Sequence, residues 1–476
     1  MNITIVGGGT AGWLAAYCIS NSQVNLHSIT VIESSEIGII GAGEGSTGFF
    51  TDVIKGNYFD SDIDLNEFVE YCDATNKIGI KFNNWLGDGT SFFTPVDGSP
   101  SAGNMDDYIF KYALHKFGKD KVHIASKIGV DYEGEKNFNV FNAFHFNAHK
   151  VGQFFKEKCL KNSVTHIDAI VEDCTFDSNS GNINSIVLAD GRKIESELFI
   201  DCTGFSRVLM KKLNVEWHSY SKYLPCNAAM PFLVDYEENE EIRPWTNATA
   251  LSAGWMWDIP LQTRRGCGYV YNDNFITKEE AKLEVEALLG REITPIKHIS
   301  FDPGRSEVFW EKNVLSLGLA SCFVEPLQAT SIHTTIAQIL LFINEFLTDD
   351  ISTTITPEHQ ESYNRRTAHF YDLNLDFVSM HYQGHKINTP FWNHIKENNI
   401  VSPFAKHIID RSKTKLVGYY EVANNFGAPA IGLWNWSLAG LDLLNSESAH
   451  RDLVNTGRYK IAEDAFLKHI TTSDYY

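Results

Sequence analysis

The pattern that most restricts the fold of this chain lies at its amino-terminal end. Residues 2–6 form a short apolar run, and a glycine-rich turn at 7–12 follows it. A helix-like stretch at 13–20 and a second apolar run at 29–32 then lead to Glu33. Strand, glycine turn, helix, strand and acidic residue in this order predict a βαβ unit of the Rossmann type, and therefore an α/β fold.

The glycine-rich turn has the spacing of a dinucleotide-binding loop. Gly7 permits the tight turn, Gly9 lets the backbone approach a pyrophosphate, and Gly12 allows the helix to pack closely on the strand. Thr10 and Ala11 lie between these glycines, where the first turn of the helix directs its free N–H groups towards an anion. We expect these five residues to bind a dinucleotide, with Glu33 on its ribose hydroxyls; the pattern does not distinguish FAD from NAD.

Two later segments repeat the pattern of a strand followed by a glycine, and the first of them, taken alone, reads as an ordinary core strand. The apolar run at 198–201 ends on Asp201 and is followed by a glycine turn, and the run at 315–317 ends on Gly318. Beyond Gly318, a polar turn leads to Thr330 and Ser331 at the start of a helix, where backbone N–H groups favour an anion such as a phosphate or a halide. The simpler interpretation is that Thr330 or Ser331 only caps that helix.

Composition excludes several classes of function. The chain has 476 residues, 40 basic and 60 acidic, so its formal net charge is 40 − 60 = −20. This balance argues against binding to nucleic acid or to anionic lipid, because both require a basic surface. No apolar run reaches the roughly 18 residues that a membrane-spanning helix needs.

The cysteines and the amino terminus point to a reducing compartment. The eight cysteines are scattered with no CxxC pair, which is typical of reduced core thiols and not of a metal centre. The first residues enter the strand pattern directly and lack the basic segment of a signal peptide. We therefore expect a cytoplasmic protein without a metal site.

The chain is long enough for two or three structural modules. Helical periodicity at 333–348 and at 359–380 indicates that the last third is mainly helical. The polar stretch at 348–356, followed by Pro357, is a plausible boundary. We predict a dinucleotide-binding body over residues 1–348 and a mainly helical module over residues 349–476.

A further motif changes the interpretation. The segment 254–260 reads GWMWDIP, so it holds Trp255, Trp257, Ile259 and Pro260, and it resembles the WxWxIP motif of the flavin-dependent halogenases, a tryptophan-halogenase-like family. The other segments similar to this family are GGGTAGW at 7–13, IGAGEGS at 40–46, KIGIKFNNW at 77–85, FVEPLQATS at 323–331, YNRR at 363–366, HY at 381–382 and PFW at 390–392.

The resemblance implies a fold and a reaction. The fold is a glutathione-reductase-like FAD-binding body with mixed sheets, joined to a mainly helical substrate-binding module. Family enzymes take reduced FAD from a separate flavin reductase, and use dioxygen and a halide to make hypohalous acid. The acid passes through a tunnel to a lysine, here Lys77, which directs it onto an electron-rich aromatic small molecule.

The resemblance also implies further site residues. Gly43 and Glu44 fall in the family's second glycine turn, and together with Asp201 and Gly318 they are expected at the FAD. Thr330 and Ser331 fall where backbone amides hold the halide. The expected lining of the tunnel and substrate site is Trp255, Trp257, Ile259, Pro260 and Glu325, with the two tryptophans screening the substrate from the flavin.

Lys77 has the setting that such chemistry requires. It lies in a stretch flanked by Cys72, Ile78 and Ile80, so we expect it to be partly desolvated. A desolvated lysine has a lowered pKa and can act either as an amine nucleophile or as a positioned hydrogen-bond donor. Lys81 is the alternative candidate, and either lysine could instead lie on a strand edge at the surface.

Gln328 departs from the family pattern. Many family members have a glutamate at this position, which can hold the oxidant or accept the substrate's proton. A glutamine can form hydrogen bonds but cannot act as a base at neutral pH. We therefore expect slower or differently organised proton removal, and a Gln328→Glu variant that halogenates faster.

Two other functions stay open on the sequence alone. One is a flavin monooxygenase that hydroxylates its substrate, and the other is an FAD-binding family member that has lost halogenation. His381 and His385 have helical spacing but no accompanying glutamate, so a zinc site is not favoured. Trp434 and Trp436 are expected to pack in the core. The sequence leaves the substrate, the preferred halide and the formation of homo-oligomers undetermined.

Overall fold

The structure is a computed structural model. It describes residues 1–22, 28–38, 43–59, 61–96, 103–125, 143–347, 355–418, 420–422 and 427–472. The glycine-rich segment expected at 40–46 and the boundary expected at 348–356 lie partly outside these ranges, at 40–42 and 348–354.

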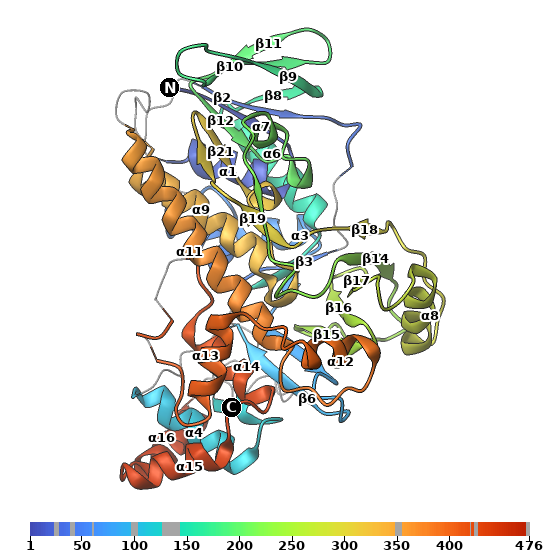
Figure 1. Ribbon diagram of the computed structural model, residues 1–476, viewed down its shortest axis with the longest axis vertical. Helices are drawn as coiled ribbons and strands as arrows, with labels where there is room; N and C mark the ends of the chain where they lie inside the picture. The colour runs from blue at the N-terminus through green and yellow to red at the C-terminus, as the bar shows by residue number, and fades with distance from the viewer. Residues whose placement is uncertain are drawn as a thin grey trace.

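The amino-terminal βαβ unit forms the centre of a six-stranded sheet at one end of the molecule (Figure 1). The strands, in spatial order, are β20 (Trp310–Glu311), β21 (Val314–Ser316), β12 (Leu198–Asp201), β1 (Asn2–Val6), β2 (Ser28–Glu33) and β8 (Thr165–Asp168). All neighbours are parallel except the edge pair of β20 and β21. The predicted Rossmann-type α/β body is therefore confirmed.

The central strands of this sheet are apolar because both of their faces are covered. Four of the five residues of β1 and all four of β12 are buried, as expected for parallel strands between helical layers. The helices α1 (Thr10–Ser20) and α6 (Ala148–Lys161) pack against each other beside the sheet. The parallel register brings the carboxyl ends of β1, β12 and β21 to one edge, where the glycine turns follow.

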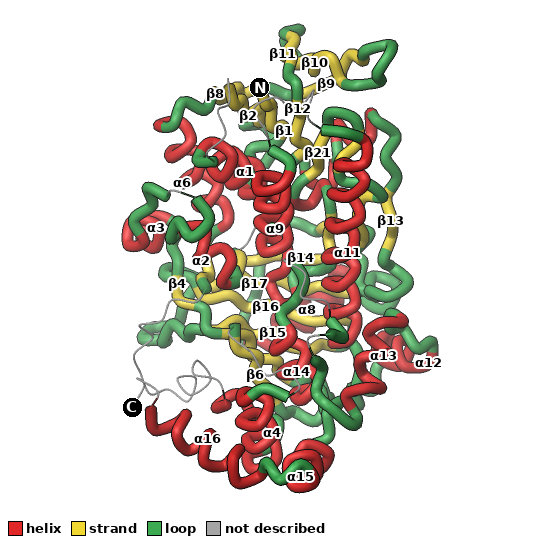
Figure 2. Tube along the Cα trace, turned by 90° about the vertical axis from the view of Figure 1, so that its left-hand side faces the viewer, coloured by secondary structure: helices red, strands yellow, loops and turns green. Residues whose placement is uncertain are grey.

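A second, mixed sheet lies between the six-stranded sheet and the carboxyl-terminal helices (Figures 1 and 2). Its strands, in spatial order, are β18 (Ile299–Ser300), β14 (Ala228–Val234), β17 (Arg265–Tyr271), β16 (Gly254–Pro260), β15 (Trp245–Leu251), β5 (Gly79–Asn83) and β6 (Ser91–Pro95). Only β15 and β5 run parallel. Helix α8 (Lys278–Leu289) covers one end of it with Ala281 and Val285.

Three small sheets and the short helices complete the body. The sheets are β3 (Glu44–Gly45), β7 (Phe144–Phe146) and β4 (Thr75–Asn76); β11 (Lys193–Glu195), β10 (Ile183–Leu188) and β9 (Val171–Phe176); and β13 (Trp217–Ser219), β19 (Gly304–Ser306) and β22 (Cys322–Phe323). The short helices are α2 (Gly48–Ile54), α3 (Leu65–Tyr71), α7 (Val208–Lys212), η1 (Val122–Ala125), η2 (Gly204–Ser206), η3 (Gly318–Ala320) and η4 (Leu327–Ala329).

The last third of the chain is mainly helical, as predicted. Helices α9 (Thr330–Glu345) and α11 (Pro357–His381) run side by side along the long axis (Figure 2). The helices that follow are α12 (Pro390–Glu397), α13 (Pro403–Ser412), α14 (Ile431–Gly440), α15 (Ser446–Asn455) and α16 (Tyr459–Thr472). Helix α4 (Met105–Phe117) packs against α15 and α16, so the helical layer also includes a segment from the first quarter of the chain.

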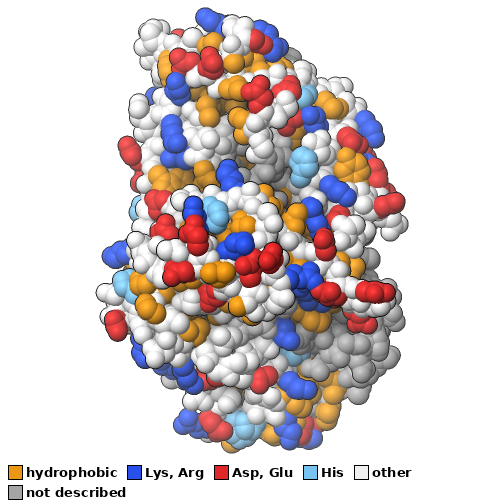
Figure 3. All heavy atoms as spheres, turned by 90° about the vertical axis from the view of Figure 1, so that its right-hand side faces the viewer, with side chains coloured by type: hydrophobic (Ala, Val, Ile, Leu, Met, Phe, Trp, Pro, Cys, Tyr) orange, Lys and Arg blue, Asp and Glu red, His pale blue; other side chains and the backbone are white. Residues whose placement is uncertain are grey.

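The surface and the thiols agree with a globular body. Figure 3 shows a face on which acidic and basic side chains are interspersed. Within the described ranges no helix is both long and apolar enough to span a bilayer. All eight cysteines are described and are free thiols, seven of them buried.

Candidate active site

The dinucleotide loop has the geometry of a phosphate cradle. Gly7 has a φ of 110°, and a Cβ there would lie 2.3 Å from the carbonyl oxygen of Cys202. A Cβ on Gly12 would lie 1.9 Å from the carbonyl oxygen of Gly7. At Gly9 a Cβ would meet nothing within 4 Å, and no side chain caps α1 there. The open face beside free N–H groups fits the pyrophosphate of FAD.

Three of the other residues predicted for the cofactor lie in or beside this loop, in different roles. Gly318, with a φ of 62°, brings η3 so close to α1 that a Cβ would lie 2.7 Å from the Cβ of Ala11. Asp201 is fully buried and accepts bonds from Thr203 and from the backbone N–H groups that start α7. Asp201 therefore shapes the turn after β12. Thr10 anchors α1 to α6 by donating to the carbonyl of Ala148.

Glu33 lies at the end of β2, as the spacing requires, and already has protein partners. Its carboxylate is 2.5 Å from Lys156 Nζ and 3.0 Å from His166 Nε2, and it accepts a bond from Trp13 Nε1. A carboxylate has about four acceptor positions, so ribose hydroxyls remain compatible with this arrangement.

Lys77 is deeply buried at the meeting point of several elements. It lies between β4 and β5, is 2% exposed, and donates from Nζ to the carbonyl oxygen of Ser46 at 2.9 Å. Burial lowers the pKa of Lys77 to about 7, because a charged ammonium is unfavourable away from water. The alternative candidate, Lys81, is half-buried on β5. The expected desolvation of Lys77 is therefore present, and it is complete.

A chain of hydrogen bonds ties the lysine segment to the end of the double-tryptophan strand. Thr75 donates to the carbonyl of Pro260 at 2.6 Å. The Nδ1 of His145 lies 3.1 Å from the same hydroxyl, and its Nε2 lies 2.9 Å from the hydroxyl of Thr246. Burial holds the pKa of His145 well below its usual range, so the ring is neutral. Two segments nearly two hundred residues apart are thus fixed together beside Lys77.

The two tryptophans of strand β16 lie on one face of the sheet with different exposure. Trp255 is buried and Trp257 is half-buried, with their ring centroids 6.3 Å apart. Trp257 lies over Gly268, where a Cβ would be 2.1 Å from the indole ring. Gly43 approaches the end of this strand, because a Cβ there would lie 3.7 Å from Ile259. The second glycine turn and the WxWxIP segment are therefore neighbours.

Glu325 is a buried carboxyl group bound to this strand. Its Oε2 accepts bonds from Trp255 Nε1 at 3.1 Å and from the Tyr382 hydroxyl at 2.7 Å. Its Oε1 is buried without a partner, and Glu325 is 0% exposed. Burial raises the pKa of Glu325 to about 7, and that of Glu44, on the second glycine turn, also to about 7.

The loop before α9 is strained and leads to unpaired polar groups. Glu325, Gln328 and Ala329 all have positive φ values, between 55° and 74°, a conformation that non-glycine residues adopt rarely and mostly at functional sites. The hydroxyl of Thr330 and the Nε2 of His333 are buried without partners in the first turn of α9. Such groups cost free energy unless a ligand pairs with them, and a halide beside the helix start fits this requirement.

His333 connects that helix to the lysine segment, a link that the sequence did not reveal. Its Nδ1 lies 3.0 Å from the hydroxyl of Thr47, and its ring stacks on Phe49. Thr47 follows Ser46, whose carbonyl binds Lys77. Ser46 ends the family-like segment at 40–46, but His333 carries no motif signal, and only the fold brings the two segments together.

Gln328 is paired with His381. The amide nitrogen of Gln328 lies 3.0 Å from His381 Nε2 and 3.5 Å from the Ser437 hydroxyl. His385 packs instead against the ring of Trp392, with centroids 4.7 Å apart. Within the described ranges no group of three or more metal-binding side chains occurs.

Trp434 and Trp436 are buried in α14, and both pack against aromatic rings of neighbouring helices. Their environment is that of core residues. The half-buried Trp257 is the more open of the tryptophans that the sequence placed at the substrate site.

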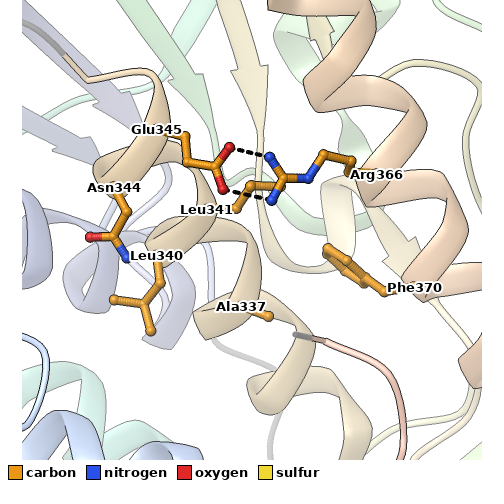
Figure 4. A pocket seen from close by; sticks show the side chains of 7 residues that line it. All are labelled: Ala337, Leu340, Leu341, Asn344, Glu345, Arg366 and Phe370. Atoms are coloured by element: carbon orange, nitrogen blue, oxygen red, sulfur yellow. Dashed lines mark hydrogen bonds and ion pairs between the residues drawn. The ribbon is translucent and has the colours of Figure 1, made fainter. Parts of the chain in front are cut away.

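A separate hollow of about 280 Å³ lies between α9 and α11, away from these residues (Figure 4). Its lining is Ala337, Leu340, Leu341, Asn344, Glu345, Arg366 and Phe370. Glu345 and Arg366 form an ion pair across it. None of the predicted site residues lines this hollow, so it is not part of the candidate active site.

Comparison with known proteins agrees with this geometry. The sequence profile described as "Tryptophan halogenase" matches residues 2–430. The tryptophan 7-halogenase RebH of Lentzea aerocolonigenes is 32% identical over 438 residues, which cover 85% of this chain and 81% of RebH. The tryptophan 6-halogenase ThaL of Streptomyces albogriseolus is 30% identical over 454 residues, which cover 87% of this chain and 82% of ThaL.

Solved structures give the same answer. The crystal structure of the tryptophan 6-halogenase SttH from Streptomyces toxytricini superposes with a TM-score of 0.83 and 25% identity, and covers 99% of both chains. The tryptophan C-6 flavin-dependent halogenase Tar14 superposes with a TM-score of 0.85 and 25% identity, over 100% of this chain and 97% of Tar14. This chain is therefore an enzyme that belongs to the tryptophan halogenase family of flavin-dependent halogenases.

Proposed function

We propose that this enzyme uses reduced FAD, dioxygen and a halide to make hypohalous acid, which Lys77 directs onto an electron-rich aromatic small molecule. The observation that carries the proposal is the burial of Lys77 next to both the second glycine turn and the end of the double-tryptophan strand. Because named relatives halogenate tryptophan, tryptophan or a related indole is the first substrate to test.

Different parts of the chain would bind the cofactor and the halide. Gly7, Gly9, Thr10, Ala11 and Gly12 would hold the pyrophosphate of FAD, and reduced FAD with dioxygen supplies the oxidant for the halide. The start of α9, with the amides of Thr330 and Ser331, would hold the halide.

The double-tryptophan strand would separate the formation of hypohalous acid at the flavin from the halogenation of the substrate. Trp255 and Trp257, with Ile259, Pro260 and Glu325 beside them, would line the path of hypohalous acid and keep the substrate away from the flavin. We further propose that a separate flavin reductase supplies the reduced FAD, in the cytoplasm, where the free thiols stay reduced.

Lys77 can act in two ways, and the pH dependence of kcat/KM distinguishes them. An amine nucleophile must be deprotonated, so kcat/KM would rise with pH through the pKa of Lys77, about 7. A hydrogen-bond donor acts in both protonation states and gives no rise through that range. The pH profile of the halogenation step, measured with a constant supply of reduced FAD, decides between them.

The test is product analysis by mass. The enzyme is supplied with reduced FAD, an indole substrate and chloride, bromide or iodide in parallel. Halogenated product supports the proposal, whereas hydroxylated product or no product contradicts it. Lys77→Ala should abolish halogenation, and Lys81→Ala, on the neighbouring strand, should retain it; a Lys77→Ala enzyme that still halogenates would show that Lys77 is not the catalytic lysine.

A further inference from the structure

The orientation of the Gln328 amide is determined by its partner. The Nδ1 of His381 lies 2.8 Å from the carbonyl oxygen of Phe377. A carbonyl only accepts, so Nδ1 carries the proton and Nε2 of the neutral ring is a lone pair. The Gln328 atom 3.0 Å from Nε2 must therefore be the NH₂ group, which donates. Burial lowers the pKa of His381 to about 4, which keeps the ring neutral.

The imidazole of His381 is itself held firmly. It is buried, stacks on Phe82 with centroids 5.3 Å apart and an interplanar angle of 27°, and contacts the edges of Trp85 and Phe377. A ring fixed on its faces and at both nitrogens cannot turn to present a different atom to Gln328.

The other end of the Gln328 amide is therefore available. No described residue donates to its Oε1, and Gln328 keeps 7% exposure. Gln328 lies two residues before the start of α9. Glu325, in the same turn, accepts a bond from Trp255 of β16. The free oxygen thus lies in the turn that joins the candidate halide site to the double-tryptophan strand.

We propose that His381 positions Gln328 so that its Oε1 is a fixed, neutral acceptor for the substrate, and that the enzyme selects arenes carrying an N–H or O–H donor on the ring. This inference rests on the proposed halogenation. It assigns His381 as a positioning residue and Gln328 as a substrate-binding residue, in place of the base that a glutamate at position 328 would provide.

The reaction balances without a carboxylate base. The ring carbon forms a bond to the halogen while the oxygen–halogen bond of hypohalous acid breaks and releases hydroxide. The ring then loses its proton to that hydroxide, so arene and hypohalous acid give haloarene and water. Gln328 need only orient the substrate by accepting a hydrogen bond from the N–H or O–H group on the ring. A neutral amide oxygen is sufficient for that.

The test compares indole with 1-methylindole, which lacks the N–H donor. With bromide, kcat/KM is measured for both substrates and expressed as the ratio of indole to 1-methylindole. This ratio is divided by the ratio of their rates with free hypobromous acid, which corrects for the different intrinsic reactivity of the two rings. One hydrogen bond is worth roughly a factor of ten, so the wild-type enzyme should favour indole by about tenfold, mainly through KM. His381→Phe should bring the corrected ratio close to one, and His381→Gln, which can accept from Gln328, should restore part of it.

His385→Phe, four residues further along in the segment after α11 and packed against Trp392, is the matched control and should keep the wild-type ratio. If His381→Phe does not fold, as judged by its melting temperature, Gln328→Met supplies the same comparison. A corrected ratio near one in the wild-type enzyme, or an unchanged ratio in His381→Phe or Gln328→Met, overturns the inference alone. Absence of brominated product from both substrates overturns the proposed function and the inference together.

Discussion

At the scale of single residues, burial decides the chemistry of the site. The pKa of Lys77 falls and that of Glu325 rises, both to about 7, and desolvation is the main cause in each case. The same physical effect acts in opposite directions because one group is charged when protonated and the other when deprotonated. Each shift links protonation to folding, so each predicts a pH-dependent stability.

Replacing Lys77 should raise stability while it removes activity. Below about pH 7 the folded enzyme buries a charged ammonium at Lys77. Between pH 7 and 10.5 the unfolded chain binds more protons at Lys77 than the folded enzyme does, so the stability of the wild-type enzyme rises with pH across that range. Lys77→Met should therefore be more stable at pH 7, by on the order of 2 kcal/mol, with the difference vanishing near pH 10. Urea unfolding at several pH values measures this; Lys81→Met is the control, and an advantage independent of pH would contradict the explanation.

Glu325→Gln should show the opposite trend with pH. Between pH 4.5 and 7 the folded wild-type enzyme binds more protons at Glu325 than the unfolded chain does. The free energy of unfolding of the wild-type enzyme therefore falls as the pH rises through this range. A glutamine can accept from Trp255 and Tyr382 without carrying charge. We expect equal stability near pH 4, and a variant more stable by on the order of 1–2 kcal/mol at pH 8. Equal thermal unfolding of the two proteins at pH 8 would refute this.

At the scale of elements, the start of α9 joins the parts of the site. The strained turn from Glu325 to Ala329 places Gln328 against α11, and His333 in the first turn of α9 reaches Thr47 beside the lysine segment. A helix start with unpaired buried polar groups is less stable than it could be, which is common where a ligand must bind.

Thr330→Val should separate stability from halide binding. Valine has nearly the shape of threonine but removes the hydroxyl that is buried without a partner. We expect the ligand-free variant to gain roughly 1 kcal/mol, because an unsatisfied group is lost, while its KM for bromide rises several-fold. Melting curves and halide titrations measure the two effects; a variant with lower stability and unchanged KM would show that the hydroxyl faces a protein partner and not the halide.

At the scale of the whole molecule, distant segments of the chain depend on each other. Lys111 on α4 is buried with its Nζ 2.9 Å from Asp107 and 2.5 Å from Asp452 on α15. This cluster joins the first quarter of the chain to the last helices. The helical layer is therefore assembled only when both ends of the sequence have been folded together.

Lys111→Met should loosen the carboxyl-terminal helices. It leaves Asp107 buried without its cation, which costs about 3 kcal/mol, whereas Asp452→Asn keeps the Lys111–Asp107 pair and costs about 1 kcal/mol. Hydrogen exchange should increase in α4, α15 and α16 of Lys111→Met and stay unchanged at α1. Equal losses in the two variants would contradict this account.

The sequence by itself determined the elements whose signals are local. The glycine spacing, the apolar strands and the helical periodicities predicted β1, α1, β2, α9 and α11 within a few residues, because these depend on neighbours in the chain. The family motifs likewise indicated Lys77, Trp255 and Gln328 as candidate site residues, and their roles stay predictions.

Only the tertiary structure decided what those residues contact. The bonds from Lys77 to Ser46, from Tyr382 to Glu325 and from Gln328 to His381 cross 31, 57 and 53 residues. No local pattern encodes such partners, since they arise from how sheets and helices pack. Burial, and with it the lowered pKa of the lysine and the fixed amide of Gln328, is likewise a property of the packed molecule, because desolvation depends on every element that surrounds a group.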